Sequence, residues 1–430
     1  MRAPVRVTRR TPRRLLRGPA PLRPRRPARL VALLGVLGPG LIAANAGNDA
    51  GGIATYADVG ARYGYDLLWM MVLITVSLVV VQEMAARMGA VTGKGLAELI
   101  REQYGVRWSA FSTVAVLIAN LGICISEFVG IGAALGLAHV PPQASVPVAA
   151  MLVWLLLVRG SYKVAERVFV LMTIPFFAYP VAAVLARPHW GAVGRAIVVP
   201  HIQLTSGYVL LFVATAGTTI TPFMQLYLQS AVVERGLDPD DLPAERLEVA
   251  SGSIFANLVA GFIIIATGAT LYEHGVRRVS SAADAARALA PFAGRYAEVL
   301  FAVGLLGASL LAAAILPVTA AYVISETFGF EKGIRHGARE APVFVAVITV
   351  LIAVGTAVAI VPGIPVIPLL IGVQAVNGAL LPVTLFFVWR LASNRELMGE
   401  HANGRIFGIV AGATVVATSA LSLALLVVTL

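Results

Sequence analysis

The residues that could most plainly do chemistry lie between positions 38 and 55, which read GPGLIAANAGNDAGGIAT. Glycines, a proline, asparagines and one acidic residue, Asp49, interrupt a long apolar run here. Each glycine costs a helix about 1 kcal/mol relative to alanine, and a carboxylate at bilayer depth is costly without partners. We therefore expect the helix to unwind, so that freed carbonyl groups and Asp49 form a cation site near the membrane midplane. The alternative is a structural carboxylate that caps the second half of the helix at its positive end.

A second apolar segment is interrupted in the same way. Residues 209–230 read VLLFVATAGTTITPFMQLYLQS, with Gly217, several threonines and Pro222 at the centre. Proline removes a backbone donor and clashes with the preceding turn, so the helix must open there. Paired interrupted helices at matching places in two halves of a chain indicate an inverted-repeat transporter with its site at the repeat interface.

The side chains around both interruptions are oxygen donors. We expect Asp49 to be the one direct anionic ligand, Thr218 and Thr221 to be hydroxyl or water-mediated partners, and carbonyl groups near Asn48 and Gly217 to complete the set. Oxygen ligands suit hard divalent cations, and Mg²⁺ in particular keeps several of its waters. A soft metal would favour cysteine or methionine ligands.

Other polar residues inside apolar segments have two interpretations each. Glu127 is either a proton or ion relay or a structural hydrogen-bond partner. Gln374 and Asn377 either serve the site or join helices, as membrane amides often do. Met224, two residues after Pro222, is the one nearby thioether.

Composition predicts an all-α polytopic membrane protein. Hydrophobic residues make up 58% of the chain, charged residues 13%, and the mean hydropathy is +0.85. A single cysteine, Cys124, excludes a disulfide framework, and the sequence has no nucleophile–base motif, phosphate loop or zinc signature, so we expect neither an enzyme nor a cofactor. Eleven segments of about 20 apolar residues can span the bilayer: 31–56, 66–88, 109–137, 143–158, 167–186, 206–232, 249–271, 297–325, 342–361, 364–389 and 406–428.

These segments define the expected organisation. Residues 1–30 form an arginine-rich arm, and 31–430 form the transmembrane domain. That domain divides into one five-helix repeat at about 31–187, an inverted one at about 205–391, and an extra helix at about 406–428.

The net charge of +11 is concentrated in the arm, which holds eleven arginines and no acid. We expect a cytoplasmic topology anchor that could bind anionic lipid, rather than a nucleic-acid site. With the N-terminus inside, the inner loops carry fifteen lysines and arginines and the outer loops seven, which favours a cytoplasmic N-terminus and an outside C-terminus in the plasma membrane. No obligate protein partner is evident.

Several motifs together resemble the Nramp family of divalent metal transporters. They are GPG, IATYADVGARYGYDLLW (53–69), VQEMAARMGAVTGKGLAELI (81–100), SEFVGIGAAL (126–135) and LYLQSAVV (226–233). The resemblance covers nearly the whole chain. It implies a leucine-transporter-like fold of two inverted five-helix repeats.

The resemblance also assigns roles to residues near the first interruption. The family's Asp-Pro-Gly-Asn motif falls on Asp49 to Gly52, so the aspartate is kept and the asparagine ligand is replaced by Gly52. Gln374, eight residues before Pro382, matches a glutamine that can approach the ion.

The departures from the family pattern point to one branch. Thr221 stands where typical members carry the methionine that favours Mn²⁺ or Fe²⁺, and Phe223 stands for a histidine. Cys124 replaces an acidic residue of proton-coupled members, while Glu127 remains. These departures resemble the Nramp-related magnesium transporters, which implies Mg²⁺ uptake with Mn²⁺ tolerated and no proton coupling.

Membrane potential alone is sufficient to drive such uptake. A divalent cation gains about 4.6 kcal/mol per 100 mV, enough for a gradient on the order of a thousandfold. Two alternatives stay open: a proton-coupled Mn²⁺ or Fe²⁺ transporter with Met224 as the soft ligand, and an amino-acid or organic-cation transporter on the same fold. A membrane receptor or scaffold is a further alternative, but paired interrupted helices have no obvious purpose in such a protein.

Overall fold

The structure is a computed structural model that describes residues 46–159, 171, 178–287, 290, 294, 297–333 and 340–429. The arginine-rich arm, the beginning of the first predicted span and part of the fifth lie outside these residues. Within them, nine helical segments are long and apolar enough to cross a bilayer. The helices of these segments are α4 (Leu68–Thr92), α6 (Val106–Gly136), α7 (Pro142–Arg159), α11 (Ser206–Thr219) with α12 (Pro222–Arg235), α13 (Leu242–Thr267), α16 (Ala297–Phe328), α17 (Pro342–Ala359), α18 (Val366–Ala392) and α20 (Arg405–Thr429).

Shorter elements connect or complete the spans. The first and fifth spans are represented by η1 (Ala46–Asn48) with α3 (Ala50–Tyr63) and by α9 (Ala178–Leu185). The remainder are α5 (Leu96–Tyr104), α10 (Trp190–Val198), η3 (Pro239–Asp241), the π-helical η4 (Gly268–Tyr272), α14 (Ala282–Ala286), α19 (Arg395–Met398) and η7 (Gly399–His401).

Both predicted helix interruptions are present. Asp49 has an extended backbone, with φ −67° and ψ 179°, between η1 and α3. The second break falls at Ile220 and Thr221, and α12 starts on Pro222. Thr221 is extended because the residue before a proline avoids the helical region, and proline is tolerated at the first helical position because that N–H needs no partner.

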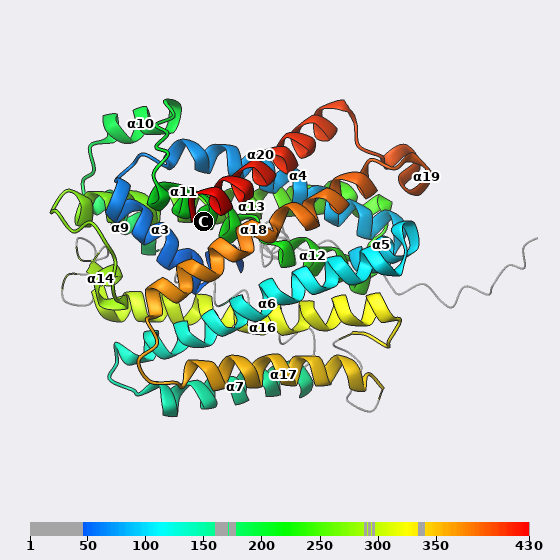
Figure 1. Cartoon of the computed structure of the whole chain (residues 1–430), viewed down its shortest axis with the longest axis horizontal. Coiled ribbons are helices and arrows are strands. Elements are labelled where there is room, and N and C mark those ends of the chain that lie inside the picture. The colour runs from blue at the N-terminus through cyan, green and yellow to red at the C-terminus, as the bar shows by residue number, and fades with distance from the viewer. Residues whose placement is uncertain are drawn as a thin grey trace, which may run out of the picture. The chain divides into compact units, whose positions relative to one another are not determined.

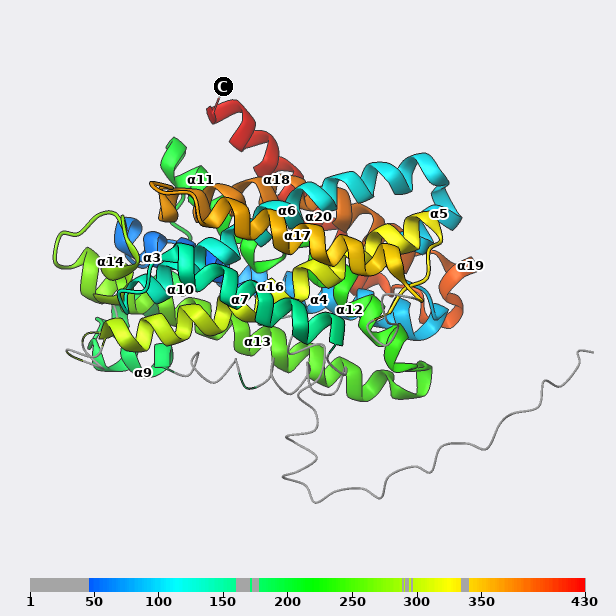
Figure 2. The same ribbon diagram turned by 90° about the horizontal axis from the view of Figure 1, so that it is seen from below.

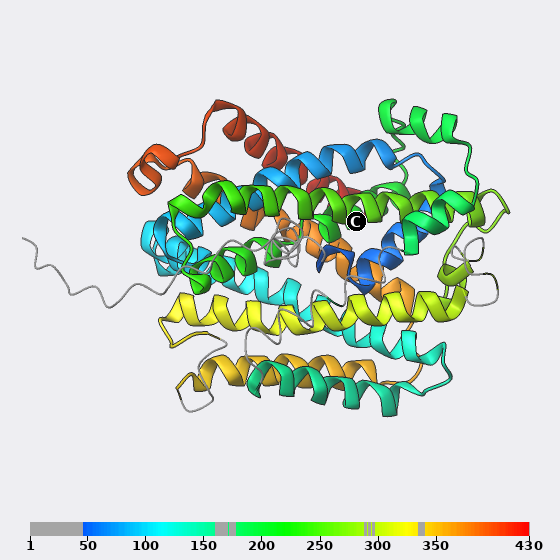
Figure 3. The same ribbon diagram turned by 180° about the vertical axis from the view of Figure 1, so that it is seen from behind.

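The helices pack in two sets around these breaks. One set consists of α6, α7, α16 and α17. Figure 1 shows α16 beside α6, and α7 beside α17 below them. The other set includes α4, which packs on α12 and α13; Figure 3 shows α13 beside α4. Helix α18 packs on α11, α3 and α6, so it joins the two sets next to Asp49. In Figure 2 the last turns of α20 extend past α18.

Some details differ from the sequence-based expectations. Helix α4 continues to Thr92, beyond the predicted end of this span at about 88, and Gln82 and Glu83 are buried well inside it. Helix α13 begins at Leu242 rather than near 249. Neither α5 nor α10 is predicted, since each has only nine residues and is too short to span.

Candidate metal site

Asp49 lies at the first break and caps α3. Its Oδ1 accepts a hydrogen bond from the Gly52 backbone N–H at 2.5 Å, which satisfies one of the unpaired N–H groups of the first turn. The side chain is 1% exposed. A buried carboxylate at the positive end of a helix is stabilised by the helix dipole, so both interpretations of Asp49, cap and ligand, are compatible with this position.

The second break places a threonine against the same carboxylate. Thr218 Oγ1 lies 3.4 Å from Asp49 Oδ1 and 3.2 Å from the Gly47 carbonyl oxygen. A side chain at Gly52 would overlap both the Gly47 carbonyl and the Thr218 hydroxyl. Three oxygen-bearing groups from two interrupted helices, the Asp49 carboxylate, the Gly47 carbonyl and the Thr218 hydroxyl, therefore converge where Gly52 has no side chain.

Helix α18 closes the site from a third direction. Gln374 Nε2 donates to both carboxylate oxygens of Asp49, at 3.0 and 2.9 Å. Asn377, one turn later, donates to the Gly217 carbonyl at 2.7 Å and lies 3.4 Å from Gln374 Oε1. The amide of Gln374 can also present its carbonyl oxygen, so rotation of this one group would exchange a donor to Asp49 for a cation ligand.

Glu127 lies next to this cluster on α6. Its Oε2 accepts a hydrogen bond from the Ala50 backbone N–H at 3.1 Å, and Ser126 donates to Oε1 at 3.2 Å. The carboxyl group is fully buried. It therefore contacts the residue that follows Asp49 without bonding Asp49 itself.

The side chains of two predicted residues, Asn48 and Thr221, are not hydrogen-bonded to Asp49 in this structure. The Asn48 amide donates to the Ala256 carbonyl of α13 at 3.0 Å, so its side chain joins the break to α13. Thr221 is buried, and its Oγ1 has no hydrogen-bond partner among the described residues. A buried hydroxyl without a partner costs about 1–3 kcal/mol, which makes Thr221 available to a ligand or a water.

The predicted residues thus divide into two groups. The structure brings together Asp49, Gly52, Thr218 and Gln374, with Glu127 and Gly217 adjoining them through Ala50 and Asn377. Asn48 is next to Asp49 in the chain but bonds α13, and Thr221 Oγ1 has no hydrogen-bond partner among the described residues.

Sequence reasoning missed a polar contact behind the second break. Gln82 Nε2 lies 3.7 Å from Met224 Sδ, and Gln82 Oε1 lies 3.5 Å from Ser253 Oγ. The methyl group of Met224 also borders Gly47, where an added side chain would overlap it. The signal was present, because Gln82 is a glutamine within an apolar helix, but its distance from Met224 in the chain gave no reason to pair them.

The polar groups of the cluster are mostly neutral oxygen donors. Within the described ranges, no group of three histidine, cysteine, aspartate or glutamate residues surrounds a common point. The donors near Asp49 are instead one carboxylate, a hydroxyl, an amide and backbone carbonyl groups. Such a set can replace part of the hydration shell of a hard cation.

Comparison with known proteins agrees with this architecture. The family model described as natural resistance-associated macrophage protein-like, or Nramp, matches residues 40–428. The chain belongs to the Nramp family. It is 32% identical over 402 residues to the divalent metal cation transporter MntH of Ralstonia nicotianae, covering 88% of this chain and 87% of that protein. It is 30% identical over 397 residues to MntH of Deinococcus radiodurans, with 88% and 86% covered.

Solved structures extend the agreement to the fold. A crystal structure of the Eremococcus coleocola manganese transporter aligns with a TM-score of 0.74 at 20% identity, covering 93% of this chain and 87% of that one. MhsT in complex with L-phenylalanine aligns with a TM-score of 0.58 at 13% identity, covering 91% and 97%. The predictions of Nramp membership and of a leucine-transporter-like, all-α fold are confirmed, and membership in this transporter family confirms that the chain is not an enzyme.

Proposed function

We propose that this member of the Nramp family imports divalent metal cations by alternating access, with Mg²⁺ as the preferred ion and Mn²⁺ tolerated. The observation that carries the proposal is the Asp49 carboxylate at a helix break, within reach of the Thr218 hydroxyl and the Gln374 amide. The names of the related MntH proteins support divalent metal transport.

The proposed ligand set contains one charge and several neutral oxygens. Asp49 binds directly, Thr218 and Thr221 bind through their hydroxyls or through water, and Gln374 turns its carbonyl oxygen toward the ion. The carbonyl groups near Asn48 and Gly217 and the space at Gly52 complete the site. Support for the Mg²⁺ preference comes from short side chains at Gly52 and Thr221, since a wider cavity accepts an ion that retains waters.

The proposed driving force is the membrane potential without a coupled proton. Helices α3, α11 and α12 would move with their neighbours against the set formed by α6, α7, α16 and α17. Glu127 bonds the backbone at Ala50, so it can relay movement of α3 to α6 even without exchanging a proton. The proposed location is the plasma membrane, with the N-terminus cytoplasmic and the arm, which lies outside the described residues, on anionic lipid.

One observation favours a second candidate, a proton-coupled Mn²⁺ or Fe²⁺ transporter. Met224 borders Gly47 at the first break and lies against Gln82. The Gly47 carbonyl in turn contacts the Thr218 hydroxyl, so the thioether lies next to a residue of the cluster. A related solved structure is of a manganese transporter. On this alternative Met224 would turn into the site as the soft ligand.

Substitution of Thr221 separates the two candidates. In Thr221→Met, a thioether replaces a buried hydroxyl that has no partner among the described residues. We expect the ratio of Mn²⁺ to Mg²⁺ uptake to rise about tenfold, equivalent to about 1.4 kcal/mol, because sulfur ligands favour softer ions. Initial uptake rates of both ions into proteoliposomes measure this ratio.

The matched control is Thr221→Leu, which has a side chain of similar bulk and no sulfur. A ratio that changes equally in both variants would assign the effect to size and would contradict the role of Thr221 as the position that sets metal preference. A wild-type protein that already excludes Mg²⁺ would favour the second candidate.

A further inference from the structure

An apolar groove lies on the membrane-spanning surface between α4, α10 and α13. Its volume is about 370 Å³, and its lining includes Leu68, Met71, Val193, Ile197, Leu258 and Phe262. The main polar feature is a hydrogen bond of 2.9 Å from Asn257 Nδ2 to Thr75 Oγ1, which joins α13 to α4. Both α4 and α13 belong to segments with the length and hydropathy of bilayer spans.

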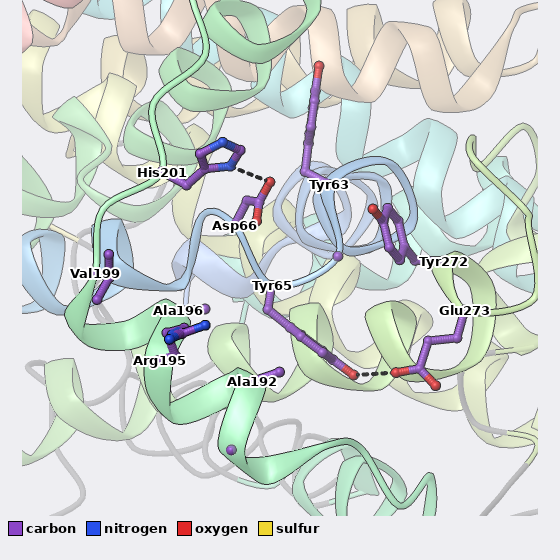
Figure 4. Close-up of a pocket in the computed structure, with 12 residues that line it drawn as sticks. Tyr63, Tyr65, Asp66, Ala192, Arg195, Ala196, Val199, His201, Tyr272 and Glu273 are labelled. Atoms are coloured by element: carbon purple, nitrogen blue, oxygen red, sulfur yellow. Dashed lines mark hydrogen bonds and ion pairs between the residues drawn. The ribbon is translucent and has the colours of Figure 1, made fainter.

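Helix α10 separates this groove from a polar pocket. Trp190, Val193 and Ile197 lie on the face toward the groove. The opposite face, with Ala192, Arg195, Ala196 and Val199, lines a pocket of about 540 Å³ shown in Figure 4. Helix α10 therefore has an apolar face toward the spans and an opposite face that carries the cationic Arg195.

The bilayer determines what can fill the groove. Trp190 is 49% exposed and Ile197 is 39% exposed, and amphipathic helices with tryptophan lie at the membrane interface. Apolar surface at hydrocarbon depth is covered by acyl chains rather than by water.

The pocket on the other face of α10 contains one arginine together with two carboxylates. His201 Nδ1 lies at hydrogen-bonding distance, 2.8 Å, from Asp66 Oδ2. The Tyr65 hydroxyl donates to Glu273 Oε1 at 3.1 Å. Both carboxylates therefore already have hydrogen-bond partners. Figure 4 shows Arg195 apart from both of these pairs. An arginine guanidinium binds a phosphate with paired hydrogen bonds.

We propose that one phospholipid straddles α10, with an acyl chain in the groove beside α4 and α13 and its phosphate at Arg195 on the other face of the helix. The occupant follows from three features together: an apolar lining on two spans, an interfacial helix as the wall, and a cationic side chain on the other face of that helix.

The groove is also connected to the proposed metal site, an extension that rests on the proposed function. Asn257 of α13 bonds α4 beside the groove, while the preceding carbonyl, that of Ala256, accepts the Asn48 amide at 3.0 Å. Asn48 immediately precedes Asp49. A lipid that displaces α13 therefore shifts the hydrogen bond that holds the first break, and transport depends on which lipid occupies the groove.

Two glycines allow the groove to be filled without disturbing the packing. Gly194 and Gly261 both line it, and a Cβ added to either meets no heavy atom within 4 Å. We expect Gly261→Phe to occupy the space of the acyl chain and to fold, since it removes a glycine from a helix interior. Gly372 on α18 is the matched control, because it also faces open space and does not line the groove.

The test measures bound lipid directly and needs no ion. The wild type, Gly261→Phe and Gly372→Phe are reconstituted with a phosphatidylethanolamine that carries a diazirine on one acyl chain, and the crosslinked peptides are identified. We expect labelling of residues 254–265 in the wild type and the control, and at least a fivefold loss in Gly261→Phe. Arg195→Gln should weaken labelling with the acyl position unchanged. Labelling spread evenly over the spans, or equal labelling of all variants, would overturn the proposal.

A second readout tests the connection to transport. Initial cation uptake by the wild type should change at least twofold between bilayers of short and long acyl chains, and Gly261→Phe should remove that dependence. If lipid labelling behaves as expected but no variant transports a cation, the lipid site stands and the proposed function fails. If uptake occurs without specific labelling, the lipid site fails and the proposed function stands.

Discussion

Asp49→Ala is expected to abolish divalent cation uptake, with a loss of at least about 100-fold, equivalent to about 2.7 kcal/mol. The substitution removes the one carboxylate on which Gly52, Thr218 and Gln374 converge. Without it the proposed ligand set contains no charged group, and neutral donors alone cannot repay the loss of the hydration shell of the cation. The measurement is the initial uptake rate in proteoliposomes at a fixed inside-negative potential.

Asp49→Asn separates the charge from the helix cap. Asparagine caps helices as well as aspartate does, so this variant should keep the melting temperature of the wild type within a few degrees and still lose uptake. If Asp49→Asn transported normally while Asp49→Ala unfolded, Asp49 would be a structural cap and no metal ligand.

The second large effect is expected at Gly217, where α11 lies against α18. A Cβ at this position would overlap the Gln374 carbonyl oxygen and the backbone of Gly378. Both obstacles are main-chain atoms, so the helices must separate, at a cost of about 1–3 kcal/mol for one added methyl group. Gly217→Ala should therefore lower the melting temperature and also reduce uptake more than tenfold, because the separation moves Gln374 away from Asp49.

Gly372→Ala on α18 provides the control for this prediction. A Cβ there meets open space, so stability should be unchanged or slightly higher, as expected for alanine replacing glycine in a helix. Thermal unfolding in detergent and uptake after reconstitution distinguish the two variants. Normal uptake by Gly217→Ala would contradict the close approach of α11 and α18 as a requirement of the site.

The sequence could predict the breaks and Asp49 because their causes are local. Pro222 cannot donate a backbone hydrogen bond wherever it lies, and glycines near Asp49 weaken the helix whatever packs against it. Thr218 follows from the second break, since paired interrupted helices meet at the centre of an inverted repeat.

The partners that complete the site could not be predicted from spacing. Gln374 lies 325 positions from Asp49; its residue type made it a candidate, but only the family resemblance places it near the ion. The contacts of Gln82 with Met224 and of Asn48 with Ala256 depend on how α4 and α13 are packed. Helix α10 escaped prediction because its nine residues show no spanning length, although it forms the wall between the apolar groove and the polar pocket.

The most direct test of the proposed function is uptake of Mg²⁺ into wild-type proteoliposomes at imposed potentials, with lumenal pH recorded at the same time. We expect entry that increases as the lumen is made more negative, with no change in lumenal pH. Each 100 mV should support about a thousandfold gradient at equilibrium, from about 4.6 kcal/mol per divalent ion. Entry of Mn²⁺ alone, accompanied by acidification of the lumen, would contradict uncoupled magnesium transport.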